Sequence, residues 1–133
     1  MAETWMGRAS RNICAAKHTM EFHTGDPFSW NIVGFLSNQA VELALHHFLE
    51  RVAGNDYIDE HSIVTLLWRA KDAELDGYIP AELVSALESG ASQLYCLGDP
   101  NAGGVDCFVA ESDARDAMHF ADSFCFAMQR ECP

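Results

Sequence analysis

The fold is decided by residues 34–49, which read GFLSNQAVELALHHFL. Their apolar side chains cover more than one stripe of a helix, which is typical of a helix surrounded by neighbours. The dipeptide Asp26-Pro27 begins this helix, because the carboxylate can accept backbone N–H groups and proline fits the first turn. The dipeptide Gly54-Asn55 ends it. We therefore predict a long central helix over residues 27–53.

Four further segments show helical spacing of apolar residues, and clusters of Gly, Pro, Asn and Asp separate them. No convincing alternating strand pattern competes with them. A chain of 133 residues fits one domain with a proper core. We expect an all-α, up-and-down bundle of about five helices in a single domain spanning residues 1–133. The predicted helices cover residues 3–21, 27–53, 60–75, 80–96 and 111–130.

The chain is strongly acidic, with 20 Asp and Glu residues against 8 Lys and Arg residues and a formal net charge of −12. This field repels phosphate backbones and anionic membranes, and the eight basic residues are dispersed. We expect no non-specific DNA binding. No apolar run approaches the roughly 20 residues that span a bilayer, and the N-terminal residues do not resemble a signal peptide. These features predict a cytoplasmic protein without a membrane segment.

The five cysteines are odd in number and lack the paired spacing of a zinc site. A core of this size needs no disulfides, so we expect reduced cysteines. Cys14 and His18 share a helix face at a spacing of four residues, but two ligands do not close a metal site. We therefore predict no metal and no cofactor.

Three segments of the chain resemble the HEPN family of helical domains. Residues 39–45, QAVELAL, are similar to the family pattern Q-A-x-E-x-A-L, and residues 61–67, HSIVTLL, are similar to H-x-L-x-x-L-L. Residues 111–121, ESDARDAMHFA, resemble the final helix of the family. The resemblance covers essentially the whole chain. It implies a bundle of four or five mainly antiparallel helices, often dimeric and related to helical domains that sit beside nucleotidyltransferases.

The chain departs from the family at the catalytic motif. Catalytic HEPN members carry R-x4–6-H near the start of a late helix, whereas the corresponding residues 94–100 read LYCLGDP. The resemblance therefore implies a non-catalytic binding protein in a toxin–antitoxin or defence setting. Its expected partners are a second copy or a minimal nucleotidyltransferase, and its expected ligand is a nucleotide-like molecule or RNA.

Four residues are candidates for ligand binding. Gln39 and Glu42 lie three residues apart on an otherwise apolar helix, so their polar groups need partners. They form either a buried structural network or a ligand-facing pair in which Glu42 has a raised pKa. His46 stands where the family commonly has lysine, and we expect it to be partly exposed. Tyr95, within residues 94–100, is the fourth candidate.

Two other function classes stay open. A metal-independent ribonuclease could use a displaced pair, either Arg115 with His119, which share a helix face, or Arg11 with His18, which lie two turns apart. A third class is an acidic scaffold or an inhibitor that mimics nucleic acid, which requires carboxylates gathered on one face.

Overall fold

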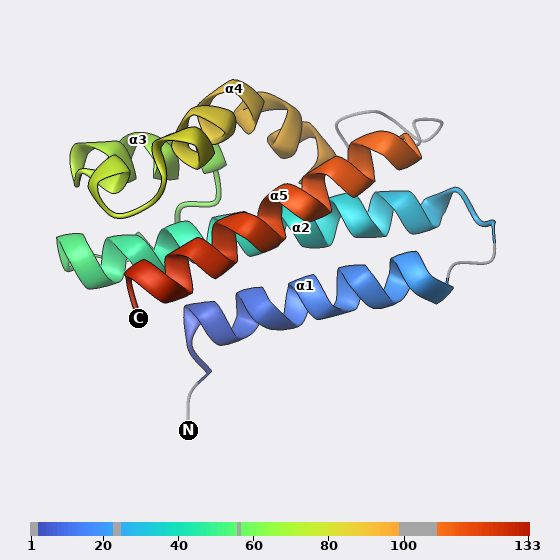
Figure 1. Cartoon of the computed structure of the whole chain (residues 1–133), viewed down its shortest axis with the longest axis horizontal. Coiled ribbons are helices and arrows are strands. Elements are labelled where there is room, and N and C mark those ends of the chain that lie inside the picture. Colours follow the sequence, from blue (N-terminus) through green and yellow to red (C-terminus); the bar gives the residue numbers. More distant parts are fainter. Residues whose placement is uncertain (1–2, 23–24, 56, 99–108) are drawn as a thin grey trace.

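The computed structural model describes residues 3–22, 25–55, 57–98 and 109–133, with the backbone alone for residues 92–98. The described residues form five α-helices, two short helical turns and no strand, which confirms the all-α prediction (Figure 1). The α-helices are α1 (Trp5–Phe22), α2 (Phe28–Phe48), α3 (Ile63–Asp72), α4 (Ala81–Gly98) and α5 (Glu111–Glu131). The short turns are the π-helical η1 (Leu49–Ala53) and the 3-10 helix η2 (Leu75–Gly77).

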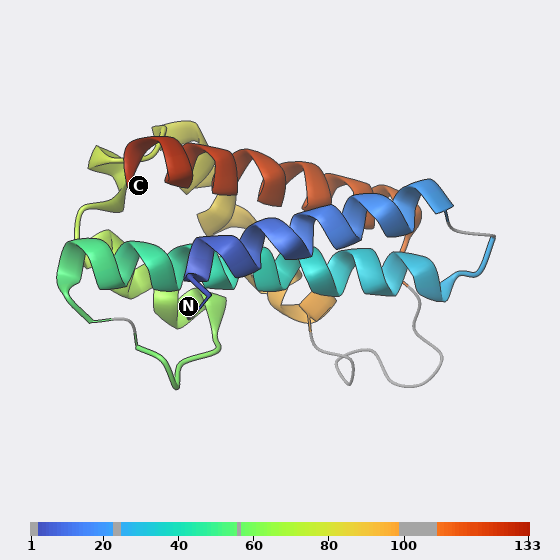
Figure 2. The ribbon, with the colours of Figure 1, turned by 90° about the horizontal axis from the view of Figure 1, so that it is seen from below.

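Helices α1, α2 and α5 lie side by side, and α3 and α4 lie on the opposite side of α2 and α5 from α1 (Figures 1 and 2). All four other α-helices pack against α2. Helix α1 runs antiparallel to α2 and α5, whereas α2 and α5 run parallel. Two contacts show this parallel register, because Ala40 meets Cys125 and His47 meets Cys132. Helices α3 and α4 lie between α2 and α5 in the sequence and return the chain to the end of the bundle where α5 begins.

The main core forms around the second half of α2, where side chains from every helix meet. Burying one large apolar side chain stabilises the fold by roughly 1.5–3 kcal/mol. A smaller cluster at the other end of the bundle joins α1, α2 and α5 through Ala16, Trp30, Val33, Ala114 and Met118. The largest fully buried residues of the main core include Leu45, Phe48, Leu49, Ile63, Leu66, Leu75, Ile79, Leu87, Phe124 and Met128.

The ends of α2 follow the predicted signals. The Asp26 Oδ1 atom accepts a hydrogen bond from the Phe28 backbone N–H at 3.0 Å, and Gly54 takes the left-handed φ of 72° at the far end. Residues 49–53 continue the helix as a π turn instead of an α turn. The predicted span 27–53 is therefore helical from Phe28 to Ala53, with Pro27 as the N-cap, and its geometry changes over the last five residues.

Helix α3 begins at Ile63, three residues later than predicted. Ser62 is its N-cap, because the Ser62 Oγ atom accepts a hydrogen bond from the Thr65 backbone N–H at 3.3 Å. The Glu60 Oε1 atom in turn accepts from the Ser62 backbone N–H at 2.9 Å. Residues 60–62 thus form the cap that satisfies the free N–H groups, and they are not part of the first helical turn.

In the part of the chain that the structure describes, none of the helices combines the length and the apolar character that crossing a bilayer demands.

The core arrangement predicts different effects for two phenylalanines of α5. Phe124 is fully buried, whereas Phe126 exposes 63% of its surface. We expect Phe124→Ala to lower the free energy of unfolding by about 3–5 kcal/mol because it leaves a cavity. We expect Phe126→Ala to change it by about 0.5 kcal/mol or less. Urea denaturation followed by circular dichroism measures both, and equal losses would contradict the placement of α5.

Candidate functional site

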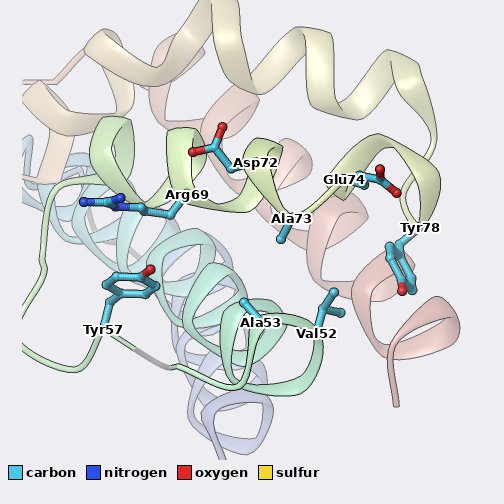
Figure 3. Close-up of a pocket in the computed structure, with 8 residues that line it drawn as sticks. All are labelled: Val52, Ala53, Tyr57, Arg69, Asp72, Ala73, Glu74 and Tyr78. Atoms are coloured by element: carbon cyan, nitrogen blue, oxygen red, sulfur yellow. The ribbon is translucent and has the colours of Figure 1, made fainter.

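One cavity of about 480 Å³ lies where η1, the segment around Tyr57, α3 and η2 meet (Figure 3). Its lining residues come from chain segments that follow one another closely in sequence. They are Val52, Ala53, Tyr57, Arg69, Asp72, Ala73, Glu74 and Tyr78. None of them was among the residues singled out from the sequence, because no motif marks this set.

A second candidate region is the outer stripe of α2, made by Phe28, Ile32, Phe35, Gln39 and Glu42, which we call the α2 seam. The spacing of four, three, four and three residues places these side chains along one face and matches the seam of a coiled coil. The first three expose 53%, 49% and 37% of their surface. Residues 27–41 contain no charged residue at all. The α2 seam is therefore an apolar, charge-free surface at its N-terminal end.

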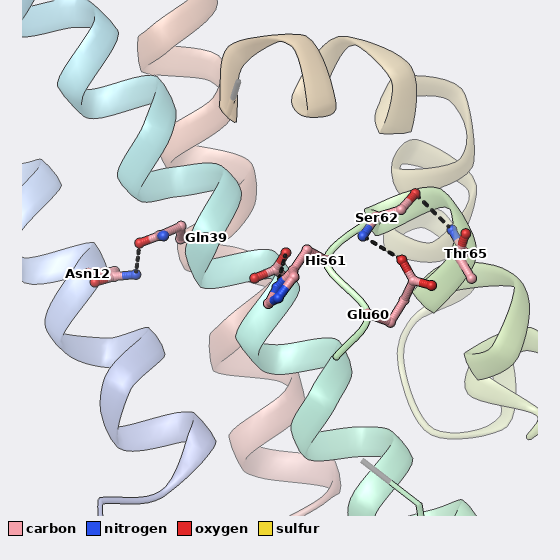
Figure 4. A network of polar contacts seen from close by, with 7 residues as sticks. Asn12, Gln39, Glu60, His61, Ser62 and Thr65 are labelled. Atoms are coloured by element: carbon pink, nitrogen blue, oxygen red, sulfur yellow. Dashed lines mark hydrogen bonds and ion pairs between the residues drawn. The ribbon is translucent and has the colours of Figure 1, made fainter. Parts of the chain in front are cut away.

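The C-terminal end of the α2 seam is polar and partly covered (Figure 4). The Gln39 Oε1 atom accepts a hydrogen bond from the Asn12 Nδ2 atom of α1 at 3.3 Å. The Glu42 Oε1 atom lies 3.8 Å from the Nδ1 atom of His61, which precedes α3, and the Glu42 side chain exposes only 15% of its surface. The two candidates thus have partners from two different segments of the chain.

The environment of Glu42 shifts the balance toward its neutral form relative to a carboxyl in water. Burial raises the pKa of the Glu42 carboxyl above its usual value of 4.5. The nearby His61, His46 and Arg8 act in the opposite direction without cancelling the effect of burial. The direction agrees with the sequence hypothesis of a raised pKa. A carboxyl with a shifted pKa and imidazole neighbours is a candidate for a functional group.

His46 lies deeper than predicted. The expectation of partial exposure was wrong, because His46 exposes 2% of its surface. The Trp5 ring stacks on it with the ring centres 4.7 Å apart, and the Trp5 Nε1 atom donates a hydrogen bond to the Glu50 Oε2 atom at 2.7 Å. The Arg8 guanidinium lies 5.5 Å from the Trp5 ring centre. A ligand approaching from solvent therefore meets Trp5 before His46.

Four further residues of the site, Trp5, Arg8, Asn12 and His61, were not predicted from the sequence. A usable signal was present in α1, because spacings of three and four residues place Trp5, Arg8 and Asn12 on one helix face. The contact between His61 and Glu42 had no such signal, since it depends on how the segment before α3 folds back over α2.

The two displaced catalytic pairs lie on exposed helix surfaces. The Arg115 Nε atom bonds Glu111 at 2.8 Å, and its guanidinium lies 4.9 Å from the Trp30 ring centre, while His119 is exposed. On α1, Arg11 pairs with Glu3 at 2.6 Å, and the ring of the exposed His18 lies against Phe22. The four residues come from two different helices. Their catalytic role stays a prediction.

Tyr95 lies on α4, but its side chain is outside the part of the chain that the structure describes. The described cysteines are unpaired, with Cys14 exposed and Cys125 and Cys132 buried. Burial raises the pKa of the Cys125 thiol to about 12, with a smaller effect from Asp122. Among the described residues, no three His, Cys, Asp or Glu side chains gather as a metal site requires.

The fold and site define an all-α helical-bundle protein whose central helix exposes three large apolar side chains along one face. The family model for the HEPN domain matches residues 2–130, nearly the whole chain, and the chain therefore belongs to the HEPN family. No curated protein matches the chain, and no solved structure matches it.

The raised pKa of Glu42 gives a testable pH dependence. The folded chain holds the Glu42 proton more tightly than the unfolded chain, so this group's contribution to stability is fully present below pH 4.5. The contribution is lost as the pH rises through the raised folded pKa. We expect Glu42→Gln to gain stability relative to the wild type as the pH increases, as measured by urea denaturation over a pH series.

The same group can be followed directly by carbon-13 NMR of the Glu42 carboxyl. His61 lowers the pKa of Glu42, so His61→Ala is expected to raise the titration midpoint further. A wild-type midpoint at or below 4.5, or a midpoint that does not move in His61→Ala, would contradict this environment.

Proposed function

We propose that this chain is a non-catalytic HEPN protein that binds a partner protein through the α2 seam. The observation that carries the proposal is the apolar, charge-free surface formed by Phe28, Ile32 and Phe35 on the central helix. Aromatic and aliphatic side chains with few charges are the signature of the centre of a protein interface. The missing R-x4–6-H motif at residues 94–100 supports a binding role over catalysis.

The geometry of the α2 seam suits a helix of the partner. Its spacing alternates between four and three residues, which lets a second helix pack side chains between Ile32 and Phe35. An RNA backbone would need cations at this surface, and residues 27–41 supply none. The α2 seam is therefore better matched to protein than to nucleic acid.

The proposed partner is a second copy of the chain or a minimal nucleotidyltransferase, in a cytoplasmic toxin–antitoxin or defence system. Two copies that each carry a charge of −12 repel each other, and a charge-free contact surface keeps this repulsion away from the centre of the interface. In either complex, the whole chain would act as a single domain. Family membership supports this pairing, since HEPN domains often dimerise or pair with nucleotidyltransferases.

A nucleotide-like ligand at the polar end of the α2 seam is a second candidate. The groups that favour it are the Gln39 amide, the exposed His61 imidazole and the Arg8 guanidinium, which all lie around Glu42 or beside it. The Glu42 carboxyl could form a hydrogen bond with a polar group of such a ligand. A shift in melting temperature on adding nucleotides, lost in Glu42→Gln, would support this second candidate.

The partner proposal predicts a loss of association in Phe35→Asp. A carboxylate in the middle of the α2 seam cannot be buried against an apolar partner without a large desolvation cost. We expect the wild type to be a dimer, or a complex with a nucleotidyltransferase from the same host, and Phe35→Asp to be a monomer. Size-exclusion chromatography with light scattering measures the mass of each.

Phe126→Asp is the matched control, because Phe126 is an exposed phenylalanine of α5 outside the α2 seam. It should associate like the wild type. A monomeric wild type that captures no nucleotidyltransferase, or equal masses for the two variants, would overturn the proposal.

The ribonuclease alternative makes the opposite prediction about RNA. We expect the purified chain to leave single-stranded RNA intact, because no Arg and His occupy the family's catalytic position. Gel analysis of a labelled RNA tests this. Cleavage that disappears in His119→Ala or in His18→Ala would instead assign catalysis to the corresponding displaced pair.

A further inference from the structure

Residues with unusual backbone conformations line the cavity beyond the end of α2. Tyr57 with φ 49° and Glu74 with φ 62° are the non-glycine residues of positive φ in the described chain, and both line this cavity. This backbone conformation costs free energy in a residue other than glycine, and the surrounding structure must offset that cost. The π turn η1 supplies Val52 and Ala53, and π turns occur frequently at functional sites. Three independent departures from regular backbone thus shape one cavity.

The two ends of the cavity differ in chemistry (Figure 3). Tyr57 and Arg69 lie at one end, where the guanidinium carbon sits 5.4 Å from the tyrosine ring centre. Glu74 and Tyr78 lie at the other end. Apolar side chains, Val52 among them, form the floor between the ends.

The charged groups at both ends are available to a ligand. Among the described residues, no ion pair involves the Glu74 carboxylate or the Arg69 guanidinium, and the guanidinium lies over the Tyr57 ring. The Tyr78 ring meets Phe48 edge to face, with the ring centres 5.4 Å apart, and it is itself exposed. The Asp72 carboxylate points away from the floor. The cavity therefore offers one carboxylate beside an aromatic ring and one guanidinium at the opposite end.

We propose that this cavity binds a peptide segment that carries a lysine or arginine side chain. The cation pairs with the Glu74 carboxylate and lies against the Tyr78 ring, while its methylene groups cover Val52 and the floor. Arg69 donates hydrogen bonds to the backbone carbonyls of the peptide. The net charge of −12 attracts such a segment over distance, and a volume of 480 Å³ suits a few residues.

Two other ligand classes fit less well. A phosphate group would find a single guanidinium, that of Arg69, in a strongly acidic chain that repels anions. A free polyamine shares the cation chemistry, but it has no carbonyl group to accept hydrogen bonds from Arg69. The dependence of binding on Arg69 therefore separates a peptide from a polyamine.

The test is an NMR titration of the nitrogen-15-labelled full chain with the peptide acetyl-Gly-Lys-Gly-amide. We expect shifts of the amide signals of Tyr57, Arg69 and Tyr78, with binding about three- to tenfold weaker for the same peptide with norleucine in place of lysine. Glu74→Asn removes the carboxylate and keeps a residue that tolerates positive φ, so it should weaken lysine-peptide binding by a similar factor. Asp76→Asn removes a neighbouring exposed carboxylate outside the cavity, and it should have no effect.

The remaining measurements distinguish a lysine peptide from a free polyamine as the bound cation. Arg69→Ala should weaken the lysine peptide and leave spermidine binding unchanged. Equal losses in Glu74→Asn and Asp76→Asn would mean general charge attraction and would overturn the site, as would equal binding of the norleucine peptide. Tighter binding of spermidine than of the peptide, without dependence on Arg69, would overturn the peptide assignment. Phe35→Asp should bind the peptide normally, so failure at the α2 seam is distinguishable from failure here.

Discussion

The structure depends on the burial of α2. Every other α-helix packs against this helix, and its second half presents buried side chains to neighbours on several sides. Burying an unpaired charged group is costly, and the one carboxylate of this second half up to Phe48, Glu42, has the His61 imidazole beside it. The large apolar side chains of α2 that stay exposed, Phe28, Ile32 and Phe35, all belong to the α2 seam. The constraint that stabilises the bundle thus also creates its most distinctive surface.

The sequence predicted the helices well because their limits are local. Asp26 and Gly54 act through hydrogen bonds and φ angles within a few residues, so reading them requires no tertiary information. The start of α3 was predicted too early, because Ser62 is the N-cap of the helix and not one of its helical residues. The site was harder to predict. The stacking of Trp5 on His46 joins residues 41 positions apart, which spacing within one helix cannot reveal.

The two candidate regions separate recognition by shape from recognition by charge. The α2 seam offers an extended apolar face with helical spacing, suited to a folded partner. The cavity beyond η1 offers charged groups fixed at its two ends, suited to a short chain segment. The cavity could not be foreseen from the sequence, because the left-handed geometry of Tyr57 and Glu74 has no residue signal comparable to glycine. The two regions share no residue, so each can be altered without changing the other.

The parallel contact between α2 and α5 has a consequence for folding kinetics. The pairs Ala40 with Cys125 and His47 with Cys132 each join residues 85 positions apart, whereas α1 and α2 are neighbours in sequence. Contacts between distant residues form slowly because the intervening chain must first be closed into a loop. We therefore expect the pair of α1 and α2 to form early and α5 to dock in the rate-limiting step, which makes this small helical protein a slower folder than its helix content suggests.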